Sequence, residues 1–352
     1  MRLPFAMFHE QHSWPFGTKG DLIIAAGDTV EIDAGEIHDY NNGVIEGTLR
    51  IVGNTTDWTM LGFAGNCDLT GTIECKESSS SGTASATTPD GVDVSHTITQ
   101  KDGGDGGDGG RGQYDGKTGN GGTGQAQNAG NGGGAGGGGA ASELTAENGG
   151  NAGMAGGKSG GGPSSIAGDN NSALPGVDGE DGSSNIGGDS NWNINSTLGG
   201  GGPAGIVPSW PTAALFGGAG GGGGSKGAHG KNLYVRCKGV FDGTGGTIDV
   251  GGEKGGDGGD GANATQSLVG SAGGGGGAAA GAGGSAGKVV VRHSGVGNYT
   301  APTYTTTGGI AGIAGVGGSA IGSAGHTGTN GSNATAAENG DSGSTDVAEY
   351  GA

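Results

Sequence analysis

The sequence predicts an all-β, non-helical protein: a short β-solenoid or β-sandwich-like scaffold interrupted by bundled, extended glycine-rich tracts of the polyglycine-II type. Three observations predict it. Glycine contributes 96 of the 352 residues and only 30% are hydrophobic, so a side-chain core cannot fill the whole chain. Short phrases of the form Gly-Thr-apolar recur as candidate strands. The glycine tracts repeat every three residues, and no long stretch has the 3.6-residue period of an α-helix.

Residues 1–20 form the first expected unit, an N-terminal docking peptide. This segment is rich in aromatic residues and proline and has neither a strand nor a helix period. We expect it to insert into a partner particle, with packing into the chain's own core as the alternative. The candidate docking residues are Phe5, Phe8, Trp14 and Phe16.

Residues 21–100 form the expected β-rich scaffold. In "DTVEIDAG", Val30 and Ile32 alternate with acidic residues, which is typical of a half-buried strand. The phrases "GTLRIVG" and "GTIECKE" begin at Gly47 and Gly71, and their separation (71 − 47 = 24 residues) suits one coil of a parallel β-solenoid. A third phrase, "GTIDVGG", begins at Gly246.

The remaining chain divides by composition into three units. Residues 101–230 form a glycine-rich module with display loops. Residues 231–300 contain strands at "KNLYVRCKGVFDG" and "GKVVVRHSG", which flank a second glycine-rich excursion at 251–287. Residues 301–352 are a Thr/Gly-rich C-terminal segment.

The glycine tracts place similar residues in columns. Written by threes, "KDGGDGGDGGRGQYDGK" puts Asp102, Asp105 and Asp108 in one column and glycines in the other two, and Asp257 and Asp260 repeat the pattern. A polyproline-II-like helix has three residues per turn, so each column becomes a straight line along it. We expect the glycines to pack inward, with their N–H groups bonded to carbonyls of adjacent helices, and the aspartates to face water. A flexible, solvated linker is the alternative.

Charge and termini exclude several classes. A formal net charge of −19 without a basic block argues against binding nucleic acid or anionic lipid. The first twenty residues lack the apolar segment of a signal peptide, and "LIIAA" at 22–26 is too short to span a membrane. The three cysteines have no CxxC pair and are expected to be small buried side chains. They are Cys67, Cys75 and Cys237.

Catalytic and metal-binding motifs are sparse, so we expect no enzyme and no cofactor. Phosphate-loop and H-E-x-x-H phrases do not occur. Weak calcium candidates are Asp105, Asp108, Asp257 and Asp260, for which a solvated face is the simpler interpretation. A polysaccharide-cleaving tailspike remains the enzymatic rival, because paired carboxylates could act on a glycosidic bond. Its candidates are Glu31, Asp33, Glu36, Asp39 and Glu46.

The glycine-rich tracts between 101 and 287, interrupted by polar and aromatic loops, resemble the receptor-recognising adhesins at the tips of phage tail fibres. The N-terminal Gly-Thr phrases look like phage fibre or spike β-solenoids. The adhesin resemblance implies a polyglycine-II bundle that holds loops against the bacterial surface. The best such loop is 191–216, with Tyr114 and 164–185 as secondary candidates and an internal plug as the alternative for 191–216. The candidate receptor-binding residues are Trp192, Ile206, Val207, Trp210, Leu215, Phe216 and Tyr114.

The function expected from these features is that of a phage virion structural protein, a tail-fibre or tail-tip component. It would be made in the host cytoplasm and would act outside the cell. Its partners would be other virion proteins at the N-terminus, a host surface receptor or glycan, and further copies of the chain, with a trimer as one arrangement. Neither nucleic-acid binding nor membrane insertion is expected. The alternatives are a capsid decoration or head-fibre protein, a self-assembling extracellular filament subunit, and the tailspike.

Overall fold

The structure, a computed structural model, is non-helical, with strands arranged largely in parallel sheets. No helix occurs in the residues that it describes. Those residues are 14–114, 117–126, 130–138, 140–142, 146–147, 206–209, 213–218, 220–266, 270–295, 297–323 and 325–349.

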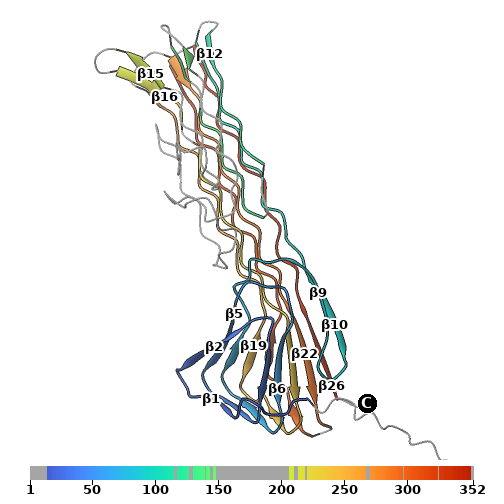
Figure 1. Cartoon of the computed structure of the whole chain (residues 1–352). Helices are drawn as coiled ribbons and strands as arrows, with labels where there is room; N and C mark the ends of the chain where they lie inside the picture. The colour runs from blue at the N-terminus through green and yellow to red at the C-terminus, as the bar shows by residue number, and fades with distance from the viewer. Residues whose placement is uncertain are drawn as a thin grey trace, which may run out of the picture.

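Three five-stranded parallel sheets form the base of the molecule, here called the stack (Figure 1). The first sheet contains β1 (Leu22–Ile24), β4 (Gly43–Ile45), β7 (Cys67–Leu69), β18 (Phe241–Asp242) and β23 (Tyr299–Thr300). The second contains β2 (Thr29–Asp33), β5 (Thr48–Val52), β8 (Thr72–Glu74), β19 (Thr247–Asp249) and β24 (Thr303–Thr305). The third contains β3 (Ile37–Tyr40), β6 (Thr59–Phe63), β17 (Leu233–Cys237), β22 (Lys288–His293) and β26 (Ser344–Glu349).

The chain visits these sheets in the order first, second, third, and repeats that order through the whole stack. The Gly-Thr phrases occupy equivalent places, because Thr48 pairs with Thr72 and Thr72 pairs with Thr247 in register. In β2 the alternation is as predicted: Ile32 is buried and Glu31 is exposed. Similar phrases therefore stack on one another across large sequence separations.

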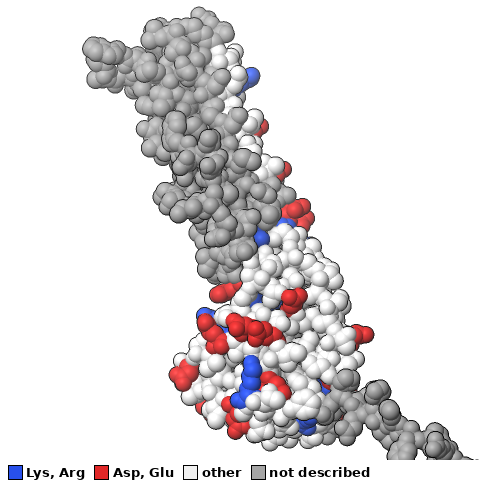
Figure 2. Space-filling model, in the orientation of Figure 1, with Lys and Arg blue, Asp and Glu red and all other residues white. Residues whose placement is uncertain are grey.

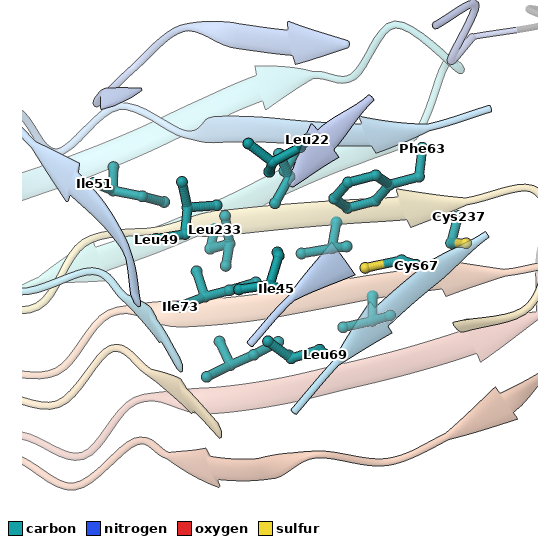
Figure 3. Close-up of a cluster of buried hydrophobic side chains, with 14 of the residues drawn as sticks. Leu22, Ile45, Leu49, Ile51, Phe63, Cys67, Leu69, Ile73, Leu233 and Cys237 are labelled. Atoms are coloured by element: carbon teal, nitrogen blue, oxygen red, sulfur yellow. The ribbon is translucent and has the colours of Figure 1, made fainter. Parts of the chain in front are cut away.

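Aliphatic and aromatic side chains fill the space between the three sheets. Figure 3 shows part of this core, including Leu49, Phe63 and Ile73, all fully buried. Cys67, Cys75 and Cys237 are free and buried, as predicted. Burial raises the pKa of all three thiols. The cysteines therefore act as small apolar side chains in a core of ordinary kind.

An antiparallel hairpin, β9 (Gly82–Thr87) and β10 (Asp93–Ile98), helps to cover a second, smaller apolar cluster. The cluster contains Trp58, Met60 and Tyr234 beside Ala84 and Val94. Asp90, in the turn of this hairpin, accepts a hydrogen bond from Tyr234 Oη at 2.7 Å. Its carboxylate also forms an ion pair with the Arg236 guanidinium at 2.6 Å.

Three long excursions leave the stack, each between the second and third sheets. They span residues 75–232, 250–287 and 306–343, and their extended segments run side by side to the far end of the molecule (Figure 1). The first two correspond to the predicted glycine tracts. The third lies within the region that the sequence analysis treated as a C-terminal segment, and its return leads into β26.

Extended segments of these excursions form a bundle held by main-chain hydrogen bonds. Segment 272–287 is central, and its N–H groups are directed in three columns to three different neighbours. Residues 275, 278, 281 and 284 donate to 250–264; residues 276, 279 and 282 donate to 130–138; residues 274, 277, 283 and 286 donate to 327–343. Its carbonyls accept from 102–111, from 220–230 and from 306–320. The three-residue period of the sequence thus becomes a three-way pattern of hydrogen bonding.

The six neighbours of the central segment also close into a ring. Main-chain hydrogen bonds link 327–343 to 102–111, 102–111 to 130–138, and so on through 220–230, 250–264 and 306–320 back to 327–343. Segment 120–126 adds to the outside, between 102–111 and 130–138. The result is hexagonal packing in which the interior is polypeptide backbone.

Glycine is required where two segments approach most closely. A methyl group on Gly110 would overlap the carbonyl oxygen of Thr329, and one on Gly281 would overlap that of Ser225. Alanine occupies interior places where there is room, as at Ala278 and Ala282, both fully buried. The expectation that glycines pack inward with bonded N–H groups is therefore met in the described part of the bundle.

Candidate functional site at the distal end

Short antiparallel strands gather at the end of the bundle remote from the stack (Figure 1). One sheet contains β14 (Ala146–Glu147), β13 (Ala140–Ser142), β21 (Gly270–Ala272) and β25 (Ile321–Gly322). Another contains β15 (Ile206–Ser209), β16 (Ala213–Phe216) and β20 (Thr265–Gln266). A hairpin of β11 (Gly112–Tyr114) and β12 (Lys117–Gly119) lies beside β13. Described strands of all three excursions therefore pair with one another at the same end of the molecule.

Four of the predicted receptor-binding residues belong to one hairpin of this end. β15 and β16 are antiparallel, with Ile206 opposite Phe216 and Val207 opposite Leu215. Tyr114 belongs to the β11–β12 hairpin, opposite Lys117, and this hairpin contacts β13, which in turn contacts β15 and β16. Trp192, Trp210 and the 164–185 loop lie outside the described residues. The structure thus brings together backbone positions that are about a hundred residues apart in the sequence.

The predicted docking residues at the N-terminus divide between two environments. Trp14 is only 4% exposed and packs in the chain's own second cluster, with its ring centroid 6.3 Å from that of Tyr234. Gly62 leaves the space that the Trp14 ring fills. This is the placement expected if the N-terminal peptide packs into the chain's own core, which was the alternative to docking on a partner. Phe5 and Phe8 lie outside the described residues.

Phe16, in contrast, is 64% exposed and held in place by its surroundings. Its N–H donates to the Asp39 carboxylate at 2.9 Å, and that carboxylate also accepts from the Gly17 N–H and the Thr18 hydroxyl. The Lys238 ammonium lies 5.6 Å from the centroid of the Phe16 ring. A fixed, exposed aromatic ring thus marks the N-terminal part of the stack.

The same contacts bear on the tailspike carboxylates. Asp39 is buried and its carboxylate binds the N-terminal loop, so it anchors structure. Glu31 and Asp33 lie on the exposed face of β2, and Glu36 and Glu46 are exposed. None of these four lines the cleft around Arg50 and Lys231 or the one beside β9 and β10.

The aspartates of the glycine tracts face outward, and several also accept main-chain hydrogen bonds. Asp108 accepts from the Gly124 N–H at 2.8 Å, Asp257 from Ile313 at 2.7 Å, and Asp260 from Val316 at 2.8 Å. Partial burial opposes ionisation of Asp257, but Lys254 and the Ile313 N–H together lower the pKa of its carboxyl. The three-residue pattern predicted that these columns face water, but it did not reveal their second role as acceptors of main-chain hydrogen bonds.

Hydroxyl and amide columns on 327–343 act in the same way. Thr329, Ser332 and Thr335 accept from the N–H groups of Arg111, Asp108 and Asp105 at 2.6–2.8 Å. On the other side, Asn330, Asn333 and Asn339 accept N–H groups of 306–320. No cluster of three or more His, Cys, Asp or Glu suited to a metal ion occurs among the described residues, the four calcium candidates included.

A charged cleft of about 210 Å³ lies on the outer face of the second sheet, and its lining includes Arg50, Glu74, Lys76 and Lys231. Its charges bind one another: Arg50 pairs with Glu74 at 2.8 Å, and Lys76 pairs with Asp249 at 2.7 Å. Lys231 is buried and donates to the carbonyls of Ile51 and Lys76, and burial lowers its pKa. Figure 2 shows charged side chains gathered over the stack. These pairs hold neighbouring strands together, so the cleft has a structural explanation.

Comparison with known proteins gives no relative. No protein-family model, no curated protein and no solved structure matches the chain. Among the described residues, no helix has the length and apolar character needed to cross a membrane.

Proposed function

We propose that this protein is a phage virion structural protein, a tail-fibre or tail-tip component that attaches to the host cell surface through its distal hairpins. The observation that carries the proposal is the separation of the two ends. A compact stack lies at one end, and at the other a bundle with a backbone interior holds several antiparallel turns together (Figure 1). Loops displayed on a rigid support are the usual form of a recognition surface.

Two finer points of architecture belong to the same proposal. We propose that the stack is a β-solenoid of five coils, because the chain repeats the order first, second, third sheet with parallel pairing throughout. We propose that the bundle is of the polyglycine-II type. Its hydrogen-bond partners advance by three residues, and the central segment bonds to six neighbours.

The mechanism is adhesion by rigid display, with no bond made or broken. Each segment of the ring is tied to at least three others by main-chain hydrogen bonds, so bending would break many of them together. The distal hairpins are therefore held on a rigid support before contact, and less conformational entropy is lost on binding.

One feature of the stack argues against the end-to-end filament alternative. In the last pass of the chain, Tyr299 and Tyr304 pack against the core, and their hydroxyls lie 2.5 Å apart. Pro302 stands between β23 and β24 and cannot donate a hydrogen bond to an added strand. These two features disfavour extension beside the first and second sheets, whereas β26 is the terminal strand of the third sheet.

Competition for adsorption tests the proposal. Purified protein incubated with host cells should reduce phage adsorption, because it occupies the receptor. A variant with 206–216 replaced by a short Gly-Ser linker should compete weakly or not at all, whereas the base variant Phe16→Ala should compete like the original protein. If the original protein does not compete, the adhesin role is wrong. If the linker variant competes equally, recognition lies outside this hairpin.

A further inference from the structure

Segment 306–320 carries an exposed aliphatic column that the hydrogen bonding of the bundle does not explain. Ile310, Ile313 and Val316 are 60%, 70% and 53% exposed, in a bundle whose other described outward columns are mainly polar. Their three-residue spacing puts them in one line, with side chains about 9 Å apart. The sequence signal is "GGIAGIAGVGG".

The main-chain N–H groups beneath this column already have hydrogen-bond acceptors on both sides. The N–H groups of Ile313 and Val316 donate to Asp257 and Asp260 of the 250–264 flank. Those of Ala311, Gly317 and Ala320 donate to asparagines of the 327–343 flank. A partner therefore cannot join as one more hydrogen-bonded segment. It must pack against the aliphatic side chains themselves.

We infer that the partner is another copy of this chain, packed with its bundle parallel to the first and with the Ile310–Ile313–Val316 column facing the symmetry axis. An identical column has the same spacing by construction, so each side chain meets its counterpart at the same height. Removing three large aliphatic side chains from water favours the contact.

The flanks of the column fit this parallel arrangement. Any rotation axis parallel to the bundle brings the 250–264 flank of one copy against the 327–343 flank of the next. The Asp260 carboxylate then lies nearly level with the Asn333 amide, which can donate to it, because these two side chains accept the adjacent Val316 and Gly317 N–H groups. An antiparallel crossing at Ile313 would instead place Asp257 against its own copy. It could gain Lys254–Asp260 contacts only by competing with the Lys254–Asp257 pair within each chain.

The parallel orientation also rests on the proposed function, because all copies in one fibre must have their stacks at the particle end. The contact itself does not depend on host binding. Oligomer formation by the purified chain and adsorption competition can therefore fail separately.

Disulfide trapping tests the orientation. In the full chain, Ile310→Cys should form a homodimeric disulfide under a mild oxidant at least about tenfold faster than Asp102→Cys, because association raises the local thiol concentration. The native cysteines are buried and should contribute little. A mixture of Ile310→Cys and Val316→Cys should give each homodimer in preference to the mixed dimer. Preferential mixed dimers would overturn the parallel arrangement, and equal rates at positions 310 and 102 would overturn the contact.

Sedimentation equilibrium tests the contact without new thiols. Ile313→Asp should shift the mass of the full chain towards the monomer, whereas Ala126→Asp, on the exposed outer segment 120–126 at the opposite side of the ring, should not. Aspartate already occupies outward columns at 257 and 260, so either variant should fold. A monomeric mass for the unmodified chain at the highest soluble concentration, or association unchanged by Ile313→Asp, would refute the inference.

Discussion

The stack and the bundle are stabilised by opposite parts of the polypeptide. In the stack, side chains such as Phe63 and Ile73 are fully buried between sheets, and apolar burial favours folding. In the bundle, main-chain groups fill the interior, and large aliphatic side chains stand outside, as at Ile313. The comparison shows that a chain too poor in apolar residues for one core can use two kinds of interior.

The two interiors also depend on each other. Glycine loses more backbone entropy on folding than any other residue, and each main-chain hydrogen bond contributes only about 1 kcal/mol net. The stack offsets part of this cost, because it fixes where each excursion begins and ends. β17, β22 and β26 are direct continuations of segments returning from the bundle. We therefore regard the stack as the element that sets the register of the glycine segments.

The largest expected effect comes from inserting a side chain into the backbone interior. Gly281→Val would place a branched side chain against the Ser225 carbonyl, and we expect the bundle to lose more than about 4 kcal/mol of stability. Hydrogen exchange followed by mass spectrometry should show fast exchange in 272–287 and its neighbours, with β6 and β17 of the stack still protected.

The matched control is Ala336→Val, which puts the same final side chain at an exposed outward position. It should leave exchange nearly unchanged. Equal exchange in both variants, or fast exchange of the central segment in the unmodified protein, would contradict the backbone interior.

A smaller effect is expected at the junction of stack and bundle. His229 is fully buried; its Nδ1 accepts the Ser285 N–H at 2.8 Å, so its Nε2 donates to the Gln100 side chain at 3.2 Å. Burial, and then the nearby Lys226, lower the pKa of His229 from its ordinary 6.5 to about 4. Below about pH 6.5 the unfolded chain therefore binds a proton at this histidine, whereas the folded chain binds it only near pH 4.

Stability should accordingly fall as the pH falls from about 6.5 to about 4, by roughly 3 kcal/mol from this histidine. His229→Gln, which keeps an acceptor for Ser285, should lose this contribution. Urea unfolding of both proteins across this range measures it, because carboxylates titrate alike in the two and cancel in the difference. A difference independent of pH would show that His229 titrates normally.

The sequence predicted which residues fill the interiors of the stack and the bundle better than it predicted how the segments are arranged there. The Gly-Thr phrases located Thr48, Thr72 and Thr247 on equivalent strands, because strand patterns are local. The period of three showed which faces of a glycine segment are small, but a glycine column carries no information about its neighbour. Which segments bond to 272–287 depends on where each excursion leaves the stack, which is a long-range property.

The candidate site was predictable to a similar degree. Aromatic and proline content singled out 191–216, and a described part of it, Ile206–Ser209 with Ala213–Phe216, forms a distal hairpin. The same criterion also selected Trp14, which the structure places in the chain's own core. Apolar content alone cannot separate a side chain that fills a core from one that is displayed.

The smallest expected effect tests the border between the bundle and water. Thr335 Oγ1 accepts the Asp105 N–H at 2.6 Å, while its own N–H donates to the Asp105 carbonyl at 2.9 Å. Thr335→Val keeps the shape and the main-chain bond but removes the acceptor, so we expect a loss of about 0.5–1.5 kcal/mol, reduced by solvent access. Thr335→Ser keeps the hydroxyl and should be nearly neutral. Local exchange at Asp105 measures both variants, and equal protection in the two would mean that the outward columns contribute solubility alone. Faster exchange in Thr335→Val only would show that the polar columns complete the hydrogen bonding which the glycine interior begins.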